Sequence, residues 1–298
     1  MSDIFDYPSR DEWVKSHTES TQNVLKASLK SLDLFYQESN ITDEQEFLQK
    51  IRDIEMSKKC NFFKKFLIFL ENAKKSFESQ KAYVGWIRRW FVNNGVFIDD
   101  TLFKQQVRFK KPERERKFAF DVDTLRAMIK VSNRDHRIFL LFLISTGARQ
   151  GEVLQLTAGD IDWTSTPVMV NFRAGITKTK QERVSFLTPQ CADELRFYIE
   201  GRYPHELIFP MKQSALIEHM AVMRKKLGLT DRYSTQTHKA TLHRIRAFVK
   251  VQLSKAVSDD FAHVILGHAE GLETYDADNL DGMREDYTKA IPRLTLRI

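Results

Sequence analysis

The longest unbroken apolar segment of this 298-residue chain runs from Ile138 to Ile144. It is too short to cross a bilayer, for which a helix needs about 20 residues. A helix without a polar side must be covered all round by other parts of a folded chain. Thr146 and Gly147 interrupt the segment, as glycine does at many helix ends. The sequence therefore predicts a fully buried helix that ends directly before a polar stretch.

The chain is long enough to form two domains, each with its own hydrophobic core. Apolar residues make up 42% of the sequence, which contains 22 Phe but only 11 Gly and 7 Pro. This composition is typical of a globular, helix-rich protein and differs from that of disordered or collagen-like chains.

Residues 20–95 have the apolar periodicity of several helices. Within 24–35 and 62–70, leucines and phenylalanines recur at helical spacing. Such a stripe is typical of a packed helix face, so we expect these aromatic rings in a core and not stacked on nucleic-acid bases. Pairs of basic residues lie between them and are candidate phosphate contacts: Lys58/Lys59, Lys64/Lys65, Lys74/Lys75 and Arg88/Arg89.

Capping residues mark where two of these helices begin. The Thr-x-x-Gln pattern at 42–45 is that of a capping box. Ser79 is a candidate cap for the following helix, which carries Trp86 and Trp90 and ends near Gly95.

Seven basic residues and Pro112 lie within residues 104–117, where apolar periodicity is weak. On composition alone this segment is a solvated charged loop. Its position between two apolar regions makes it the best candidate for an interdomain linker, and a basic strap could close around a polyanion. We predict a helical domain over 1–107, a linker over 108–117 and a second domain over 118–298.

The second domain has a mixed pattern. Residues 167–172 and 183–187 are rich in β-branched and aromatic side chains and flank a polar turn, which predicts a small antiparallel sheet. Further caps and turns indicate helices on both sides of it: Asp121 or Asp123, Thr188–Pro189, Gly228, and Ser258 with Gly267. The predicted fold class is mainly α with a small antiparallel β-sheet (α+β), in two domains.

Lysine and arginine outnumber aspartate and glutamate by 47 to 40, which gives a net charge of +7. This surplus favours a polyanionic partner, although many proteins are mildly basic. Cys60 and Cys191 fit no metal or disulfide pattern, and no glycine-rich nucleotide-binding pattern is present, so we expect no metal and no cofactor. The N-terminus has no signal-peptide pattern, and we expect a cytoplasmic, intracellular protein without membrane association.

Two arginines and two histidines are the candidates for a functional site. Guanidinium groups donate paired hydrogen bonds to phosphate oxygens, so Arg149 and Arg246 could hold a phosphodiester. His243 lies three positions before Arg246 on a predicted helix and faces the same side. His268 follows a predicted helix end, and an imidazole can donate to phosphate or exchange a proton near neutral pH. Each residue alone has an ordinary structural explanation, but the combination points to phosphodiester chemistry.

Three motifs occur in order along the chain: Thr146–Val153 (TGARQGEV), His243–Arg246 (HRIR) and Leu266–His268 (LGH). From Phe118 to the C-terminus they resemble the tyrosine recombinase (phage integrase) family, which includes archaeal, viral and mobile-element integrases and Xer-like recombinases. The first looks like the family's first-arginine box, with Glu152 expected to orient its arginine. The others are similar to its His-x-x-Arg and Leu-Gly-His boxes.

The resemblance implies a two-domain clamp around double-stranded DNA, with a core-DNA-binding domain over 1–107 and a catalytic domain over 118–298. It implies site-specific strand exchange through a 3′-phosphotyrosyl intermediate, without metal or nucleotide cofactor. Implied partners are three further copies, forming a tetramer on two DNA sites, and accessory DNA-bending proteins, which would make the protein nucleoid-associated. Residues 283–298 would dock on a neighbouring copy, although their apolar side chains could equally pack within the same chain.

The family resemblance also implies a lysine in a β-hairpin turn that protonates the leaving 5′-oxygen. Lys178 aligns best in the turn before Glu182, and Lys180 is the second choice. An alkoxide is a poor leaving group, so an acid near it is required. Both lysines could also be ordinary polar residues of a hairpin tip.

The nucleophile is expected to be Tyr275, seven residues after His268. Relatives commonly place it about nine residues after that histidine, so the spacing departs from the family pattern. Tyr287 lies nineteen residues after His268 in a helical pattern and is expected to be a packing residue. A second departure is Ala247, where many relatives have a histidine.

Two other functions compete with site-specific recombination. A DNA-binding relative that has lost catalysis would lack part of the residue set, all of which is present. A type IB topoisomerase-like enzyme shares the phosphotyrosine chemistry, but the Leu-Gly-His motif and the short chain favour a recombinase.

Overall fold

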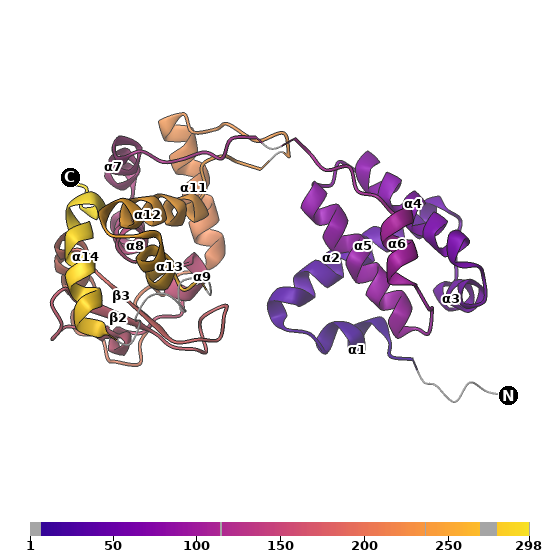
Figure 1. Ribbon diagram of the computed structural model, residues 1–298, viewed down its shortest axis with the longest axis horizontal. Coiled ribbons are helices and arrows are strands. Elements are labelled where there is room, and N and C mark those ends of the chain that lie inside the picture. Colours follow the sequence, from indigo (N-terminus) through magenta and orange to yellow (C-terminus); the bar gives the residue numbers. More distant parts are fainter. Residues whose placement is uncertain (1–6, 114, 236, 269–278, 298) are drawn as a thin grey trace. The chain divides into compact units, whose positions relative to one another are not determined.

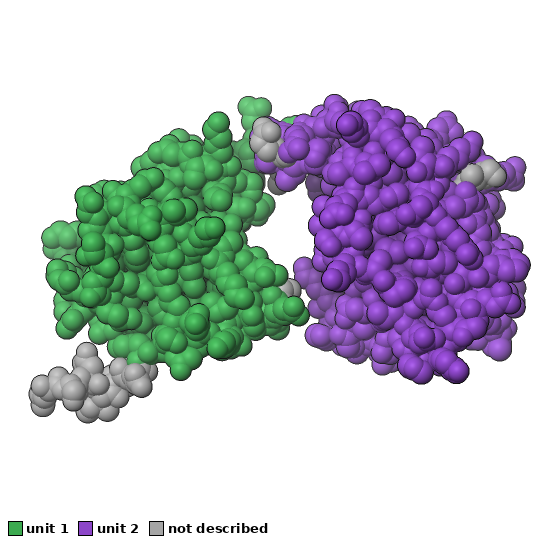
Figure 2. Space-filling view, turned by 180° about the vertical axis from the view of Figure 1, so that it is seen from behind, with its two compact units in different colours: residues 1–115 green, residues 116–298 purple. Residues whose placement is uncertain are grey.

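The computed structural model describes residues 7–113, 115–235, 237–268 and 279–297. The chain divides into two compact units, residues 1–115 and 116–298 (Figure 2). The division falls inside the basic segment 104–117. Within the described ranges, no helix is both long enough and apolar enough to cross a membrane.

The first unit is helical, with helices of up to 20 residues (Figure 1). They are α1 (Arg10–Lys15), α2 (Glu19–Glu38), α3 (Glu44–Arg52), α4 (Met56–Asn72), α5 (Phe77–Asn93) and α6 (Asp100–Gln106). Helices α2 and α4 both pack on α5, and aromatic rings fill the space between them. The rings of Phe62 and Phe91 lie 5.0 Å apart, and those of Phe63 and Phe103 lie 5.1 Å apart. These phenylalanines are buried, as predicted.

Two helix starts in this unit differ slightly from the predictions. The capping box predicted at 42–45 is not the cap that forms: α3 begins one residue later, with Asp43 as its N-cap, whose carboxylate accepts from the Glu46 amide at 3.0 Å. Ser79 is not a cap. Helix α5 begins at Phe77, and Ser76 accepts from the Ser79 amide at 3.2 Å. The helix therefore begins about one turn before the start that the sequence suggested.

The second unit surrounds a small sheet with helices. Its strands are β1 (Ile161–Asp162), β2 (Met169–Phe172) and β3 (Arg183–Phe186), which form an antiparallel sheet in the order β1-β2-β3. Its α-helices are α7 (Val122–Val131), α8 (Arg134–Thr146), α9 (Gln150–Val153), α10 (Pro189–Tyr198), α11 (Gln213–Leu227), α12 (Leu242–Ala256), α13 (Asp259–Leu266) and α14 (Leu280–Leu294). The predicted class, mainly α with a small antiparallel sheet, is confirmed. The two-residue β1 had no signal in the sequence.

Helix α8 is the buried helix that the apolar run predicted. Every residue from Ile138 to Thr146 is buried, and α7, α10, α12 and β3 pack around it. Gly147 closes it with a left-handed φ of +62°. A Cβ on Gly147 would lie 2.4 Å from a methyl carbon of Leu266, so only glycine lets the ends of α8 and α13 meet this closely. This contact places the start of α9 beside the end of α13.

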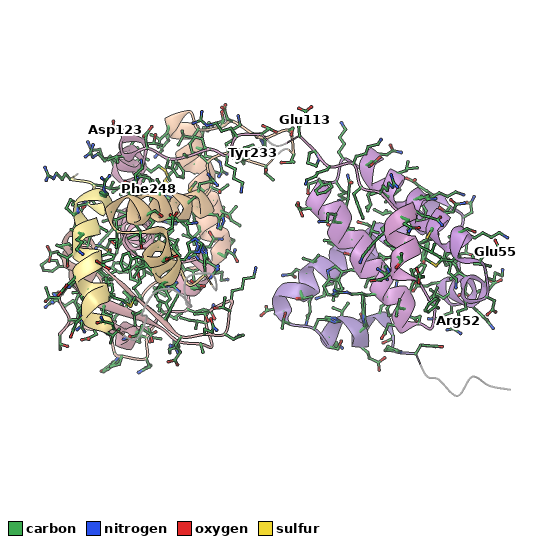
Figure 3. All side chains as sticks on the ribbon, viewed as in Figure 1. Arg52, Glu55, Glu113, Asp123, Tyr233 and Phe248 are labelled. Atoms are coloured by element: carbon green, nitrogen blue, oxygen red, sulfur yellow. The ribbon has the colours of Figure 1, made fainter. Side chains whose placement is uncertain are left out.

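The segment after the linker is fixed to the second unit by its backbone. The Phe118 amide donates to the Tyr233 hydroxyl at 2.7 Å, and the Arg244 side chain donates to the Phe118 carbonyl at 2.6 Å. Tyr233 is labelled in Figure 3. Asp121, one of the two predicted caps, then opens α7.

The C-terminal segment packs on its own unit, which is the second of the two arrangements that the sequence allowed. Helix α14 lies against α12 and buries Met283, Tyr287 and Leu294. Beyond it Leu296 is fully buried, and its carbonyl accepts from Arg126 at 2.5 Å. The apolar side chains of this segment are thus covered within its own chain.

Candidate active site of the second unit

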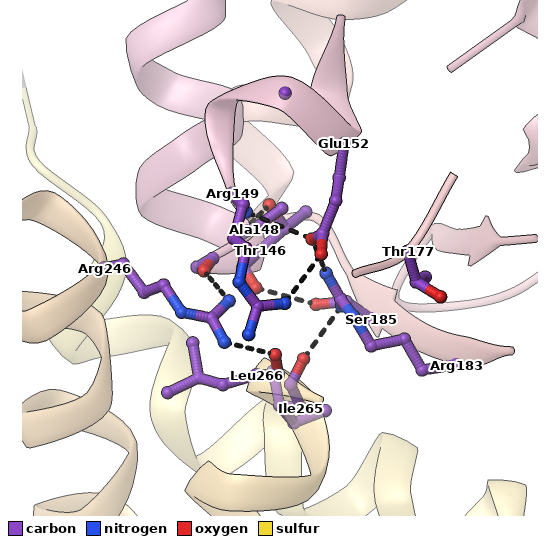
Figure 4. A network of polar contacts seen from close by, with 12 residues as sticks. Thr146, Ala148, Arg149, Glu152, Thr177, Arg183, Ser185, Arg246, Ile265 and Leu266 are labelled. Atoms are coloured by element: carbon purple, nitrogen blue, oxygen red, sulfur yellow. Dashed lines mark hydrogen bonds and ion pairs between the residues drawn. The ribbon is translucent and has the colours of Figure 1, made fainter. Parts of the chain in front are cut away.

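Arg149 occupies the N-cap position of α9, directly after the end of α8 (Figure 4). Its Nη1 donates to Glu152 Oε1 at 2.7 Å, and its backbone amide donates to Glu152 Oε2 at 3.1 Å. Only 3% of the Glu152 side chain is exposed, compared with 27% for Arg149. The carboxylate therefore holds the arginine from the inside and leaves part of its guanidinium open to solvent. This is the orienting role expected for Glu152.

Arg246, on the second turn of α12, is buried and held by two carbonyl groups. Its Nη1 donates to the Gly147 carbonyl at 2.8 Å, and its Nη2 donates to the Leu266 carbonyl at 2.5 Å. Burial, followed by repulsion from Arg149 and Arg183, lowers the pKa of Arg246 to about 9. The side chain remains cationic at neutral pH, in a position where an anion would relieve the repulsion.

His243 and Arg246 line one pocket with Arg149, as the spacing along the helix predicted. The pocket has a volume of about 480 Å³, and α11 supplies an apolar wall that includes Leu216 and Met220. His243 is exposed at its rim. Partial burial, then the charges of Arg246 and other cations, lower the pKa of His243, so its imidazole is neutral at pH 7. It can donate one hydrogen bond or accept a proton.

His268 follows the left-handed Gly267 that ends α13. Its backbone amide donates to the His263 carbonyl at 2.9 Å, and the two rings meet edge-on with centroids 5.1 Å apart. Burial, then the positive charge of Arg246, lower the pKa of His268 to about 4. The Arg246 guanidinium lies near His268, because it donates to the carbonyl of Leu266, two residues before His268.

The loop between β2 and β3 carries both candidate lysines. Lys178 is exposed, and in the described part of the chain no hydrogen bond or ion pair holds its ammonium group. Lys180 has a left-handed φ of +58° and donates to the Gly175 carbonyl at 3.3 Å. Lys178 is thus the lysine that is available to a ligand, whereas Lys180 shapes the turn.

Tyr275, the expected nucleophile, lies outside the described residues. Tyr287 lies in the core, where its hydroxyl donates to the Ser145 carbonyl at 2.9 Å. Burial raises its pKa well above the ordinary value. A fully covered phenol with its proton engaged is unsuited to attack a ligand, which agrees with a packing role.

Arg183, the first residue of β3, was not among the residues singled out from the sequence. Its Nη2 donates to Glu152 Oε2 at 2.7 Å, so a single carboxylate binds two arginines (Figure 4). The sequence placed Arg183 only at the start of a predicted strand. No local signal shows that its side chain turns inward toward α9, because that depends on how the sheet meets the helices.

One basic residue of the first unit proves to be structural. Lys59 is buried, and its ammonium group donates to the carbonyls of Arg52, at 2.8 Å, and Phe97, at 3.2 Å. It cannot act as the phosphate contact that its pairing with Lys58 suggested. Arg88 is likewise engaged within the unit, with Asp100 and over the ring of Phe103.

The fold and the site together define the class of protein. Residues 119–276, more than half of the chain, match the phage integrase family. The chain belongs to this family. The described part of the chain holds no group of three or more His, Cys, Asp or Glu side chains placed to bind a metal ion.

Similar proteins carry the same family name or fold. Tyrosine recombinase XerA of Saccharolobus solfataricus is 26% identical over 184 residues, which cover 61% of this chain and 59% of that protein. A lambda integrase dimer bound to a COC′ core site has a similar structure, with a TM-score of 0.64 at 17% identity over 93% of both chains. XerH recombinase bound to its difH substrate has a TM-score of 0.58 at 15% identity, over 90% of this chain and 76% of that one.

Proposed function

We propose that this chain is a site-specific DNA recombinase that cleaves and rejoins strands through a 3′-phosphotyrosyl intermediate. The observation that carries the proposal is the convergence of Arg149, Arg246 and His243 on one pocket. His268 lies near enough to this group for the charge of Arg246 to lower its pKa. These residues come from three separate parts of the sequence, and an excess of positive charge faces the pocket. A backbone phosphate of DNA is the ligand that such a group fits.

In the proposed reaction the two arginines neutralise the non-bridging oxygens of the scissile phosphate. As the phosphorus becomes five-coordinate, negative charge grows on these oxygens, and donors already in place stabilise it without reorganisation. The neutral imidazoles of His243 and His268 donate further hydrogen bonds or relay a proton.

The remaining groups supply the nucleophile and the acid. Tyr275 gives its phenolic proton to one of the neutral imidazoles, attacks phosphorus and becomes linked to the 3′-phosphate, while the 5′-oxygen leaves and takes a proton from Lys178. Rejoining reverses these steps with the 5′-hydroxyl of another strand. No water is consumed and no metal ion takes part in these proposed steps, and the free energy of the phosphodiester is kept in the tyrosyl link.

The first unit is proposed to bind DNA through its exposed lysines and arginines, with residues 108–117 as the linker between it and the catalytic unit. The known structures of lambda integrase and XerH are bound to DNA, which supports DNA as the partner here. A structure of lambda integrase is a tetramer on a Holliday junction, and we propose the same number of copies for the active assembly. Action on DNA would place the protein in the cytoplasm with the nucleoid.

The test is covalent capture. DNA selected by the protein from a pool of random duplexes is nicked near the site and incubated with the protein in excess EDTA, and the products are separated by denaturing electrophoresis. We expect a protein–DNA adduct that disappears in Tyr275→Phe and persists in the matched control Tyr287→Phe. Cleavage that requires magnesium and leaves no adduct would contradict the proposal. An adduct that is lost only in Tyr287→Phe would contradict the assignment of the nucleophile.

A further inference from the structure

Arg183 joins three elements that the proposed reaction needs. It begins β3, directly after the loop that carries Lys178, and 7% of its side chain is exposed. Burying a guanidinium costs free energy unless its charge and its N–H groups find partners. Both Nη atoms of Arg183 have such partners, whereas its buried Nε has none among the described residues. The partners of Arg183 therefore show what its burial is for.

Two of these partners belong to the active site. Nη2 donates to Glu152 at 2.7 Å, and Nη1 donates to the Ile265 carbonyl at 2.9 Å, near the end of α13. The guanidinium carbon also lies 3.8 Å from the ring centre of Phe172 in the adjacent strand. Arg183 thus links the hairpin to the residue that orients Arg149 and to the turn that leads to His268.

The Arg183 side chain also packs closely against Gly267. A Cβ on Gly267 would lie 2.5 Å from Arg183 Cδ and 2.8 Å from its Nε. The left-handed turn before His268 is therefore built against the Arg183 side chain. Any change in the path of this side chain moves the turn, the carboxylate, or both.

Charge gives Arg183 a second effect. Glu152 alone would neutralise most of the charge of Arg149, because the two groups are 2.7 Å apart. Arg183 binds the other carboxylate oxygen at the same distance and shares that negative charge. Three arginines and one carboxylate leave the cluster of Arg149, Arg183, Arg246 and Glu152 with two net positive charges.

We infer that Arg183 is a positioning residue of the active site, which fixes the Glu152 carboxylate and the end of α13 so that Arg149 keeps both its orientation and its charge for the scissile phosphate. This inference rests on the proposed recombinase function. Arg183 itself is covered and does not touch the DNA.

The experiment compares Arg183→Lys and Arg183→Gln with the control Arg137→Gln. Arg137 makes two hydrogen bonds of 2.8 Å with Glu194, so the control removes a more exposed arginine–glutamate pair elsewhere in the unit. Three quantities are measured: the free energy of unfolding, the Kd for DNA, and the single-turnover rate of adduct formation at saturating DNA.

Arg183→Gln is expected to slow adduct formation about 100-fold and Arg183→Lys about 10-fold, since a displacement of about 1 Å at a reacting group can cost that much. The Kd should stay within about twofold, because binding is spread over many phosphates. Arg137→Gln should change stability alone. If Arg183→Gln does not fold, Arg183→Lys still decides, since lysine keeps the charge but cannot reach both Glu152 and the Ile265 carbonyl. A wild-type rate in Arg183→Lys overturns the inference.

A double variant separates positioning from general support of the fold. If Arg183 acts through Glu152, adding Arg183→Gln to Glu152→Gln should slow the reaction by less than about threefold further, whereas independent effects would multiply. Multiplicative losses overturn the inference and leave the proposed function intact. Absence of any adduct with the wild-type protein overturns the proposed function and the inference together.

Discussion

The two units each contain a cluster of charged side chains, and the balance of charge in the two clusters is opposite. In the first unit Arg10 binds two carboxylates, Asp33 at 2.5 Å and Glu44 at 2.6 Å. In the second unit one carboxylate, Glu152, binds two arginines, and among the described residues Arg246 is held by carbonyl groups alone. The two carboxylates of the first cluster neutralise its arginine. The second cluster keeps a net positive charge, to which an anionic ligand can bind.

The pKa values show the same contrast. Burial by itself lowers the pKa of Arg10, but its two carboxylates outweigh burial and leave the pKa above the ordinary value. Burial also lowers the pKa of Arg246, and there the neighbouring arginines act in the same direction. The comparison indicates that the first cluster serves stability and the second serves binding of an anion and catalysis.

The largest expected effect comes from removing Arg149, the partly exposed arginine of the second cluster. Arg149→Ala should raise the activation free energy of adduct formation by about 3–4 kcal/mol, because one donor to the developing charge is lost. DNA binding should persist, since other phosphates are still contacted. Single-turnover kinetics and a filter-binding Kd measure the two effects. If the affinity for DNA fell as much as the rate of adduct formation, the second cluster would contribute to DNA binding and not to catalysis, and the contrast between the two clusters would be wrong.

The corresponding change in the first cluster should act on folding alone. Arg10→Met leaves two carboxylates without their cation and should lower the free energy of unfolding by roughly 2 kcal/mol, the scale of charged hydrogen bonds. Urea denaturation measures the loss. The rate of adduct formation by folded, DNA-bound protein should equal that of the wild type, and a tenfold slower rate would show that this cluster also serves the chemistry.

Acid should weaken the second unit through its histidines. Burial is the first cause that lowers the pKa of His219 and of His268 to about 4 from an ordinary 6.5. The unfolded chain therefore binds protons below about pH 6.5 while the folded chain does not, so stability is complete above that pH and falls as the pH is lowered toward 4. Denaturation midpoints at several pH values measure the fall. In His219→Gln the stability should fall less steeply as the pH is lowered. An unchanged pH dependence of stability would contradict the assignment of this fall to His219.

The smallest expected effect concerns a helix cap in the first unit. Ser76→Ala should cost about 1 kcal/mol of stability, because an amide of α5 loses its acceptor. Ser79→Ala should cost less than half of that, since in the described part of the chain the Ser79 hydroxyl hydrogen-bonds to the Ser76 hydroxyl alone. Thermal unfolding of the two variants, compared side by side, would decide between the observed cap and the one suggested by the sequence.

Much of the fold could be predicted because its signals are local. Apolar periodicity predicted the buried α8, and capping residues predicted the helix starts at Asp121 and at Thr188–Pro189. Turn chemistry predicted the hairpin around residues 173–182. The position of Ser76 was missed because serines occur at both ends of one helical turn, and either can accept the same kind of hydrogen bond.

The candidate site divides in the same way. Arg149, His243, Arg246 and His268 could be named from short motifs, because each motif keeps the residues that fix its backbone, such as Gly147. The burial of Lys59 could not be read from the sequence, where it looks like any surface lysine.

The sequence by itself determined which side chains carry charge, where the helices begin and end, and which family the chain resembles, since these depend on neighbours along the chain. Only the tertiary structure decided that Arg183 turns inward to share Glu152 with Arg149 and to reach the Ile265 carbonyl. Those outcomes depend on how the sheet, α9 and α13 pack together. Contacts between distant parts of a chain leave no pattern in the residues on either side of them.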